Sequence, residues 1–314
     1  LVMLSVAVLA GFGVHYLRSA TFLKRRSAQA LGLAMLLVLL EFSLVPPFYS
    51  LDTGSTAPGF RWLKARKGDP VTAVYPMYAA DDFYSYYYYF EQRLHEKTLV
   101  NGQALDSEAD IYRQNLLDLQ HPATPGLLAR LGAKYVMVIP SQLSRPATPH
   151  LNYPFPAWFE REKMPEGYRE VKRFSDCLIY EVTAPPAEFI PLFGAGFYQA
   201  YVDPAGRAWH PAMGAGQVTV RSRLPETVMC DIRLGLMSAR GEAHVTVRVN
   251  GRKAWKGVVP PWPADAGVQG VALNPGDNSV IIESSGGGAF LTEVPGYSDI
   301  RASFMTGNLM VTRK

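Results

Sequence analysis

The chain of 314 residues carries a formal net charge of +4, and its mean hydropathy is close to zero. A charge balance this weakly basic, without an arginine-rich stretch, excludes nucleic acid as the expected partner. The hydropathy is an average of two different regions, because residues 1–49 are strongly apolar and the remainder has the composition of a soluble protein. This remainder is long enough for two domains of ordinary size.

Two apolar segments at the start of the chain predict a membrane hairpin. Residues 30–49 contain one charged residue, Glu41, and are long enough to cross a bilayer as a helix. Residues 1–17 form the other apolar segment, and the connecting loop 18–29 carries several Lys and Arg residues and no acid. Because cytoplasmic loops collect Lys and Arg, this loop is expected to be cytoplasmic. Residues 50–314 would then be periplasmic or extracellular on a bacterial plasma membrane.

The start of the chain predicts a fragment. The first residue is Leu1 and not Met. The basic residues follow the first apolar segment, whereas in a secretory signal peptide they precede it. We therefore expect the C-terminal part of a longer polytopic protein, cut within its penultimate span. A small protein with two spans is the alternative.

Residues 50–187 have the alternating pattern of a small α/β domain. Thr124 is the expected N-cap of one helix, Pro125 its first residue and Gly132 its end. The near-continuous apolar run at 134–140 predicts a buried strand, and the order of strands and helices predicts a small parallel or mixed sheet. The other expected elements are helices over 58–67, near 80–96 and after Asp106 or Ser107, and strands over 71–76, 169–174 and 178–182.

Residues 188–314 are expected to form an antiparallel β-sandwich of jelly-roll type. Short runs of alternating apolar and polar residues recur, with turn-forming sequences between them. Asn250-Gly251 is typical of a two-residue hairpin turn, and Asn274 to Asn278 form a second turn. The expected strands cover 217–224, 228–236, 244–250, 268–273, 279–284 and 307–313.

Cys177 and Cys230 are the only cysteines. An oxidising compartment would allow them to pair. Two separate buried thiols are nevertheless the prediction, because nothing in the sequence brings the two residues together. No zinc-binding spacing or nucleophile motif accompanies them, so the chain is expected to hold no metal.

Several segments follow one another in an informative order. LLEFSLVPP ends the second predicted span, and GFRWLKARKGDPVTAVYP, LVNG, LLARLGAKYVMVIP and VTVRVNGRKAWKG follow it. This order resembles the C-terminal region of bacterial polytopic glycosyltransferases of the GT-C superfamily, relatives of the protein mannosyltransferases and aminoarabinose transferases. The resemblance implies an integral-membrane enzyme that transfers a sugar from a polyprenyl-phosphate carrier to a lipid, glycan or protein acceptor.

The resemblance also implies that the chemistry lies elsewhere. In this superfamily the catalytic acidic residue, often near a divalent metal, belongs to the first external loop, which is not in this sequence. A carboxylate there acts as base toward the acceptor hydroxyl. We therefore expect no catalytic residue and no cofactor in this chain, and no sugar transfer by the chain alone. Its soluble domains would assist recognition of the donor or the acceptor.

Residues in two segments are candidate contacts for the sugar or its lipid carrier. Glu41 is ionisable within a predicted span, where such residues are often functional, although it can also lie at the membrane interface. The run FYSYYYYF at 83–90 offers Tyr84, Tyr86 and Tyr87, because tyrosine rings bind sugars and membrane interfaces. Since the run covers every face of a helix, about half of its rings are expected to pack inward.

Three further candidates are Asn101, in the LVNG segment, and Trp255 and Trp262, near Pro260-Pro261. The two tryptophans could form a carbohydrate-binding surface on the sandwich, and ordinary core and loop packing is the alternative.

Three classes of function therefore remain open. The first is the terminal part of a membrane glycosyltransferase, whose partners would be membrane lipid, a polyprenyl-phosphate sugar and a glycan or lipid acceptor. The second is a non-catalytic, membrane-anchored glycan-binding module. The third is a structural part of a cell-envelope assembly.

Overall fold

The computed structural model describes residues 57–78, 85–101, 107–140, 164–203, 205–292, 294 and 298–314, together with residues 29 and 36. The chain divides into two compact units, Leu1–Asp52 and Thr53–Lys314. Apart from residues 29 and 36, the predicted hairpin at 1–49 lies outside the described residues. Within the described ranges, no helix is both long and apolar enough to span a membrane.

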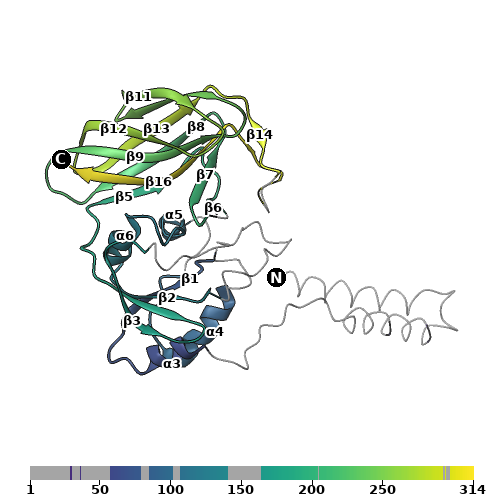
Figure 1. The fold of residues 1–314 in the computed structure, drawn as a ribbon, viewed down its shortest axis with the longest axis vertical. Helices are drawn as coiled ribbons and strands as arrows, with labels where there is room; N and C mark the ends of the chain where they lie inside the picture. Colours follow the sequence, from purple (N-terminus) through teal and green to yellow (C-terminus); the bar gives the residue numbers. More distant parts are fainter. Residues whose placement is uncertain are drawn as a thin grey trace, which may run out of the picture. The chain divides into compact units, whose positions relative to one another are not determined.

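A mixed four-stranded sheet is the centre of the α/β region (Figure 1). Its strand order is β1-β2-β4-β3, with β1 (Val71–Tyr75) parallel to β2 (Ala133–Val138) and the remaining neighbours antiparallel. β3 (Tyr168–Arg173) and β4 (Leu178–Val182) form the predicted terminal hairpin. The prediction of a small parallel or mixed sheet is confirmed.

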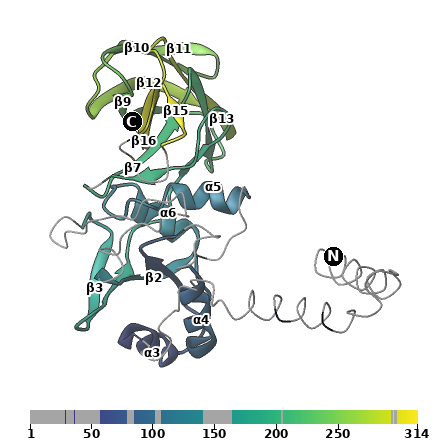
Figure 2. The same cartoon turned by 90° about the vertical axis from the view of Figure 1, so that its right-hand side faces the viewer.

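The helices described in this region are α3 (Pro58–Lys64), α4 (Ser85–His95), α5 (Glu108–Gln114) and α6 (Thr124–Arg130) (Figure 2). α3 packs against α4, and it ends three residues before the predicted Lys67. Ser107 caps α5, because its hydroxyl accepts a hydrogen bond from the Asp110 N–H, as predicted.

The predicted N-cap of α6 is wrong by one residue. Thr124 is the first helical residue, and Ala123 is the N-cap. The Thr124 hydroxyl instead donates to the Asp118 carbonyl at 2.6 Å, so a longer-range hydrogen bond outcompetes the local cap. Gly132 follows the helix with a φ of 75°, which agrees with its predicted role as the helix end.

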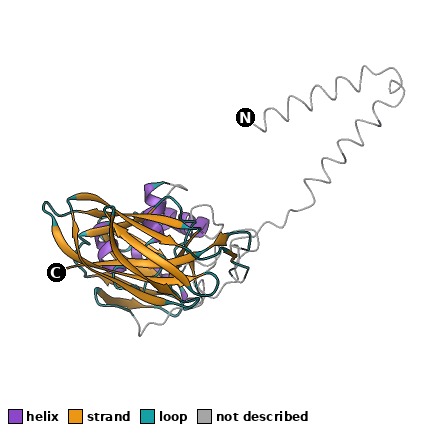
Figure 3. Cartoon of the chain, turned by 90° about the horizontal axis from the view of Figure 1, so that it is seen from above, coloured by secondary structure: helices purple, strands orange, loops and turns teal. Residues whose placement is uncertain are grey.

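The C-terminal region is a sandwich of two antiparallel sheets, whose strands Figure 3 shows in orange. One sheet has the order β11-β10-β13-β8-β5 and the other β12-β9-β16-β7-β6. The bounds are β5 (Phe189–Phe193), β6 (Tyr201–Val202), β7 (Ala208–Ala212), β8 (Ala215–Ser222), β9 (Val228–Ser238), β10 (Ala243–Val249), β11 (Arg252–Val259), β12 (Ala264–Leu273), β13 (Gly276–Ser284) and β16 (Phe304–Arg313), with β14 (Ala289–Phe290) and β15 (Arg301–Ala302) forming a small separate pair.

The strand order is that of a jelly roll. The eight strands β7 to β13 and β16 can be numbered first to eighth along the chain. The sheet that contains β7 then has the order first, eighth, third, sixth, and the sheet that contains β8 has the order second, seventh, fourth, fifth. β6 and β5 extend one edge of each sheet. The core between the sheets is made by alternate residues, such as Val245, Val247 and Val249 of β10, so the strands show the predicted period of two. The predicted antiparallel, jelly-roll-like sandwich is confirmed.

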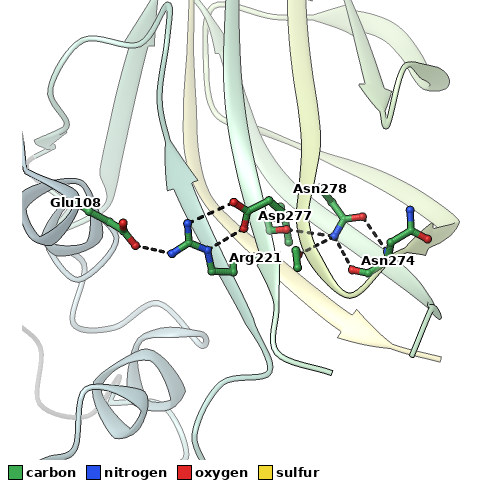
Figure 4. A network of polar contacts seen from close by, with 7 residues as sticks. Glu108, Arg221, Asn274, Asp277 and Asn278 are labelled. Atoms are coloured by element: carbon green, nitrogen blue, oxygen red, sulfur yellow. Dashed lines mark hydrogen bonds and ion pairs between the residues drawn. The ribbon is translucent and has the colours of Figure 1, made fainter. Parts of the chain in front are cut away.

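Asn278 ties together the turns at one end of the sandwich (Figure 4). Its side-chain oxygen accepts hydrogen bonds from the Asn250 side chain and the Asn274 N–H, at 2.9 and 2.8 Å. Its side-chain nitrogen donates to the carbonyls of Val220, Asn274 and Gly276. The two turns predicted from sequence are therefore held by one buried amide.

The α/β region and the sandwich share a boundary strand. In β5, Phe189 and Phe193 belong to the sandwich core, whereas Ile190 and Leu192 belong to the core of the α/β region. The period of two thus gives one strand a face in each core. Arg221 of β8 adds a polar link, because it pairs with Glu108 of α5 and with Asp277 of β13 (Figure 4).

Both cysteines are free and buried, as predicted. Burial raises the pKa of the Cys177 thiol to about 12, so this thiol stays protonated at neutral pH.

Candidate functional site

A pocket of about 760 Å³ lies where the α/β region meets the sandwich, and we call it the junction pocket. Residues 118–122, which follow α5, form one wall, and the turn before β7 forms a second. Pro263 to Asp265, at the start of β12, form a third, while Gly235 and Gly307 contribute bare backbone. The volume is within the range usual for small-molecule sites.

Asp203 organises the wall before β7. One carboxylate oxygen accepts the N–H groups of Ala205 and Arg207, and the other accepts the Arg207 side chain and the Trp209 indole N–H at 3.0 Å. Asp203 thereby fixes the guanidinium of Arg207, whose carbon lies 5.7 Å from the centre of the Trp209 ring. Arg207 is half exposed, so it presents a positioned cation to the pocket.

Asp118 is the unusual carboxyl group of the pocket. It is only 7% exposed, and this burial raises its pKa from 3.8 to about 6, even though the Gln120 and His121 backbone groups bind it. The Gln120 N–H donates to one Asp118 oxygen at 2.9 Å. A carboxyl group in a pocket that titrates near neutral pH is a common mark of a functional site.

His121 contributes a neutral hydrogen-bond donor. Burial lowers its pKa from 6.5 to about 4. Its Nδ1 accepts a hydrogen bond from the Ala123 N–H at 3.3 Å, which assigns the ring proton to Nε2. Together with Asp118, Arg207 and the exposed Asp265, this residue gives the pocket both donors and acceptors.

A chain of polar contacts behind the pocket joins its two sides. Asn308 of β16 lines the pocket, and its side-chain oxygen lies 3.2 Å from Nε2 of the fully buried His210. Its nitrogen donates to the Asn115 carbonyl, and the Asn115 side chain in turn donates to the Pro191 carbonyl at 2.7 Å. The residues that follow α5 are therefore hydrogen-bonded to both sandwich sheets.

Of the predicted site residues, Trp262 directly precedes one wall of the junction pocket in the sequence. Its side chain is 61% exposed, and the next three residues, Pro263, Ala264 and Asp265, line the pocket. Trp255 of β11 is different, because it is half-buried and packs against the sandwich core. Trp255 therefore packs as the alternative describes, while the carbohydrate-binding role of Trp262 stays a prediction.

The predicted tyrosines of α4 divide into core and surface rings, as expected. Tyr86 is 53% exposed and makes an edge contact with Tyr89, whereas Tyr87 and Tyr88 are buried. None of these α4 residues lines the junction pocket. Tyr84 lies outside the described residues.

The remaining candidates are one buried residue and one residue that the structure does not describe. Asn101 is buried, and its side chain accepts from the Val74 N–H and donates to the Val74 carbonyl, at 2.8 and 2.7 Å. This pair of bonds gives Asn101 a structural role beside β1, and its predicted ligand contact stays a prediction. Glu41 lies outside the described residues.

Sequence reasoning missed most of the pocket, including Asp118, Arg207 and Trp209, and it also missed Asp203, which binds the last two. One local pattern could have drawn attention to part of it, since Asp203-Pro-Ala-Gly-Arg207 is a turn sequence in which an Asp binds following N–H groups. Across the described ranges, no group of three or more His, Cys, Asp or Glu residues is arranged to hold a metal ion.

Comparisons with known proteins add little to this geometry. Neither a protein-family profile nor a curated protein matches the chain. Among solved structures, a GH26-CBM35 β-(1,4)-mannanase of Podospora anserina has a TM-score of 0.27 and 15% identity, covering 40% of this chain and 28% of that one. A mutant of a family 29 carbohydrate-binding module has a TM-score of 0.26 and 10% identity, covering 41% and 84%.

A Cry1Da tryptic core variant of Bacillus thuringiensis has a TM-score of 0.29 and 11% identity, covering 46% of this chain and 29% of that one. The chain spans less than a third of the length of the first solved structures that it matches. Similarities this low do not assign a function.

Proposed function

We propose that the junction pocket binds a saccharide. The observation that carries this proposal is the mixture of groups in one pocket: carboxyl groups of Asp118 and Asp265, the guanidinium of Arg207 and the neutral donor His121. The exposed Trp262 directly precedes the lining residues Pro263 to Asp265 in the sequence. Sugar hydroxyls both donate and accept hydrogen bonds, while the C–H faces of a sugar pack on aromatic rings. The pocket offers partners for both parts of such a ligand.

The preorganisation of Arg207 also favours ligand binding over a purely structural role of the pocket. Asp203 holds Arg207 through two contacts, at 3.0 and 2.9 Å, before any ligand arrives. Side chains fixed in this way lose little conformational freedom on binding, which improves affinity.

The wider role that we propose is recognition of the sugar donor or acceptor for a polytopic glycosyltransferase. The resemblance of the segment order to the GT-C superfamily supports this role, as does the predicted hairpin at 1–49. In that setting the pocket would orient a glycan, while the catalytic carboxylate belongs to another part of the enzyme. Glycan binding without any associated transfer would favour the anchored binding module.

A pair of matched variants tests saccharide binding. The full chain in detergent is titrated by calorimetry with mono- and oligosaccharides selected on a glycan array. Trp262→Ala should weaken binding about fivefold or more, as expected for loss of an aromatic contact. Phe290→Ala is the control, because Phe290 is 59% exposed and, unlike Trp262, has no pocket-lining residue next to it in the sequence.

Asp265→Asn provides a second test, with Asp299→Asn as its exposed control outside the pocket. Equal effects in each variant and its control, or the absence of any array ligand, would refute the proposed saccharide site.

A further inference from the structure

α3 and the start of β2 carry an exposed surface of cations and aromatic rings. We call it the α3 cationic surface, and it consists of Arg61, Trp62, Lys64, Arg66, Lys67 and Tyr135. The four cationic side chains are exposed, and the two aromatic rings are half-buried. The surface is separate from the junction pocket, which contains none of these residues.

The positive charge of this surface has no ion-pair partner among the residues that the structure describes. No described residue forms an ion pair with Arg61, Lys64, Arg66 or Lys67. Asp69, the nearest acid in sequence, accepts the Thr98 N–H and hydroxyl at 2.8 and 2.7 Å. Four exposed cations on one short segment, with no ion pair to any described residue, point to an anionic ligand.

The rings hold part of this charge in place. The Arg66 guanidinium carbon lies 4.3 Å from the centre of the Trp62 ring, and the Trp62 and Tyr135 rings meet edge to face at 5.0 Å. Lys134 adds another cation, with its nitrogen 5.5 Å from the Tyr135 ring centre. Trp and Tyr beside Lys and Arg are the residues that proteins place at membrane interfaces.

The opposite side of α3 is anchored in the fold. Phe60 and Leu63 are fully buried, and Phe60 contacts the rings of Tyr87 and His95 on α4 at 5.9 and 5.6 Å. The cations of α3 are therefore displayed by a packed element.

The position of α3 in the sequence favours a bilayer over other anionic partners. The second predicted span ends at Tyr49, so eight residues separate it from Pro58. A chain of this length reaches at most about 28 Å when fully extended. The surface would therefore stay close to lipid headgroups.

We propose that the α3 cationic surface docks on the anionic phosphate headgroups of a phospholipid bilayer. Cations near such a surface each contribute about fivefold to the docking equilibrium, and interfacial aromatic rings add to the contact. This interaction is independent of saccharide binding, and it would hold the soluble domains against the membrane.

The test places an environment-sensitive fluorophore on α3 of the full chain in lipid nanodiscs. Ala65→Cys provides the label site, and Glu242→Cys provides a control site in the turn between β9 and β10, since both positions are exposed. Quenching by spin-labelled lipid is compared in nanodiscs of phosphatidylcholine alone and with about 30% phosphatidylglycerol. A third arm adds polyprenyl phosphate to phosphatidylcholine.

We expect phosphatidylglycerol to increase quenching at residue 65 only, and salt at about 0.5 M to reverse the increase. Lys64→Gln/Lys67→Gln should lower the docking equilibrium about 25-fold, because two cations are lost. Arg252→Gln/Lys253→Gln, an exposed pair at the start of β11, should change nothing.

Three results would overturn the proposal: equal quenching in both lipids, an unchanged Lys64→Gln/Lys67→Gln variant, or an increase with polyprenyl phosphate alone. If the hairpin does not insert, salt-sensitive flotation of the full chain with phosphatidylglycerol vesicles becomes the readout. Failure to float would then refute docking.

Discussion

Asp118→Asn should stabilise the protein at neutral pH. Burial raises the pKa of Asp118 from 3.8 to about 6, so the folded chain binds this proton more tightly than the unfolded chain does. Between these two pH values the stability of the wild type falls as pH rises, and above pH 6 the full penalty of a buried charge is present. The Asn side chain keeps the shape and can still accept the Gln120 N–H.

The size of the effect follows from the pKa. Because a difference of one in pKa corresponds to about 1.4 kcal/mol, the rise of Asp118 corresponds to about 3 kcal/mol. The difference in free energy of unfolding, variant minus wild type, should therefore be near zero below pH 3.8 and reach about 3 kcal/mol above pH 6.

Urea denaturation of both proteins over a series of pH values measures this difference. His95, His121 and His210 also make stability depend on pH, since burial lowers their pKa values to about 4, 4 and 3. The stability that these histidines contribute is lost as pH falls below 6.5, which is the opposite sense to Asp118. Their contribution is the same in the wild type and the variant, so it cancels in the difference. If the difference in free energy of unfolding between variant and wild type did not change with pH, the raised pKa of Asp118 would be refuted.

Three further predictions concern other parts of the fold. Arg221→Gln should raise the pKa of Asp277 toward its ordinary value, as measured by NMR titration, because the Arg221 side chain lowers that pKa in the wild type. Since both partners are at least partly exposed, the loss in free energy of unfolding should stay below about 1 kcal/mol, and a loss above about 2 kcal/mol would contradict this weak ion pair. Asn278→Ala should cost about 3 kcal/mol of unfolding free energy, since several buried groups lose their partner, and a loss no larger than that of Arg221→Gln would count against it. Cys177 and Cys230 should together give two thiols per chain in denaturant, with or without reductant, and react slowly in the folded chain; a thiol count that requires reductant would reveal a disulfide.

The sequence predicted the parts of the fold that have a simple periodicity. β8, β9, β10 and β13 alternate between core and surface, so their positions were predicted to within a few residues. Asn250 and Gly251 have φ angles of 49° and 78°, as the predicted hairpin turn requires.

Strands without alternation were missed. β5 and β7 are buried along their whole length, so their sequences show no period of two. In β5 this is because the second face packs on the α/β region. β11 is an edge strand with mostly exposed or half-buried residues, and its polar composition concealed it.

The candidate site was hidden for a different reason. Asp118, Arg207, Asp265 and Asn308 come from four separate parts of the chain, and only the packing of the α/β region on the sandwich brings them together. The sequence identified exposed Trp262 by residue type alone. Its relation to the pocket depends on the start of β12, which no local pattern reveals.

The two faces of β5 have a consequence for how this protein can be divided or inherited. A cut at the predicted boundary of 187 and 188 would leave the α/β core without Ile190 and Leu192 and expose the apolar groove that they fill. It would also separate Asp118 from Asn308, which line the same pocket. Evolution could exchange this jelly roll for another only by supplying a strand that fits both neighbours, so we expect the two regions to be transmitted between genomes as one block.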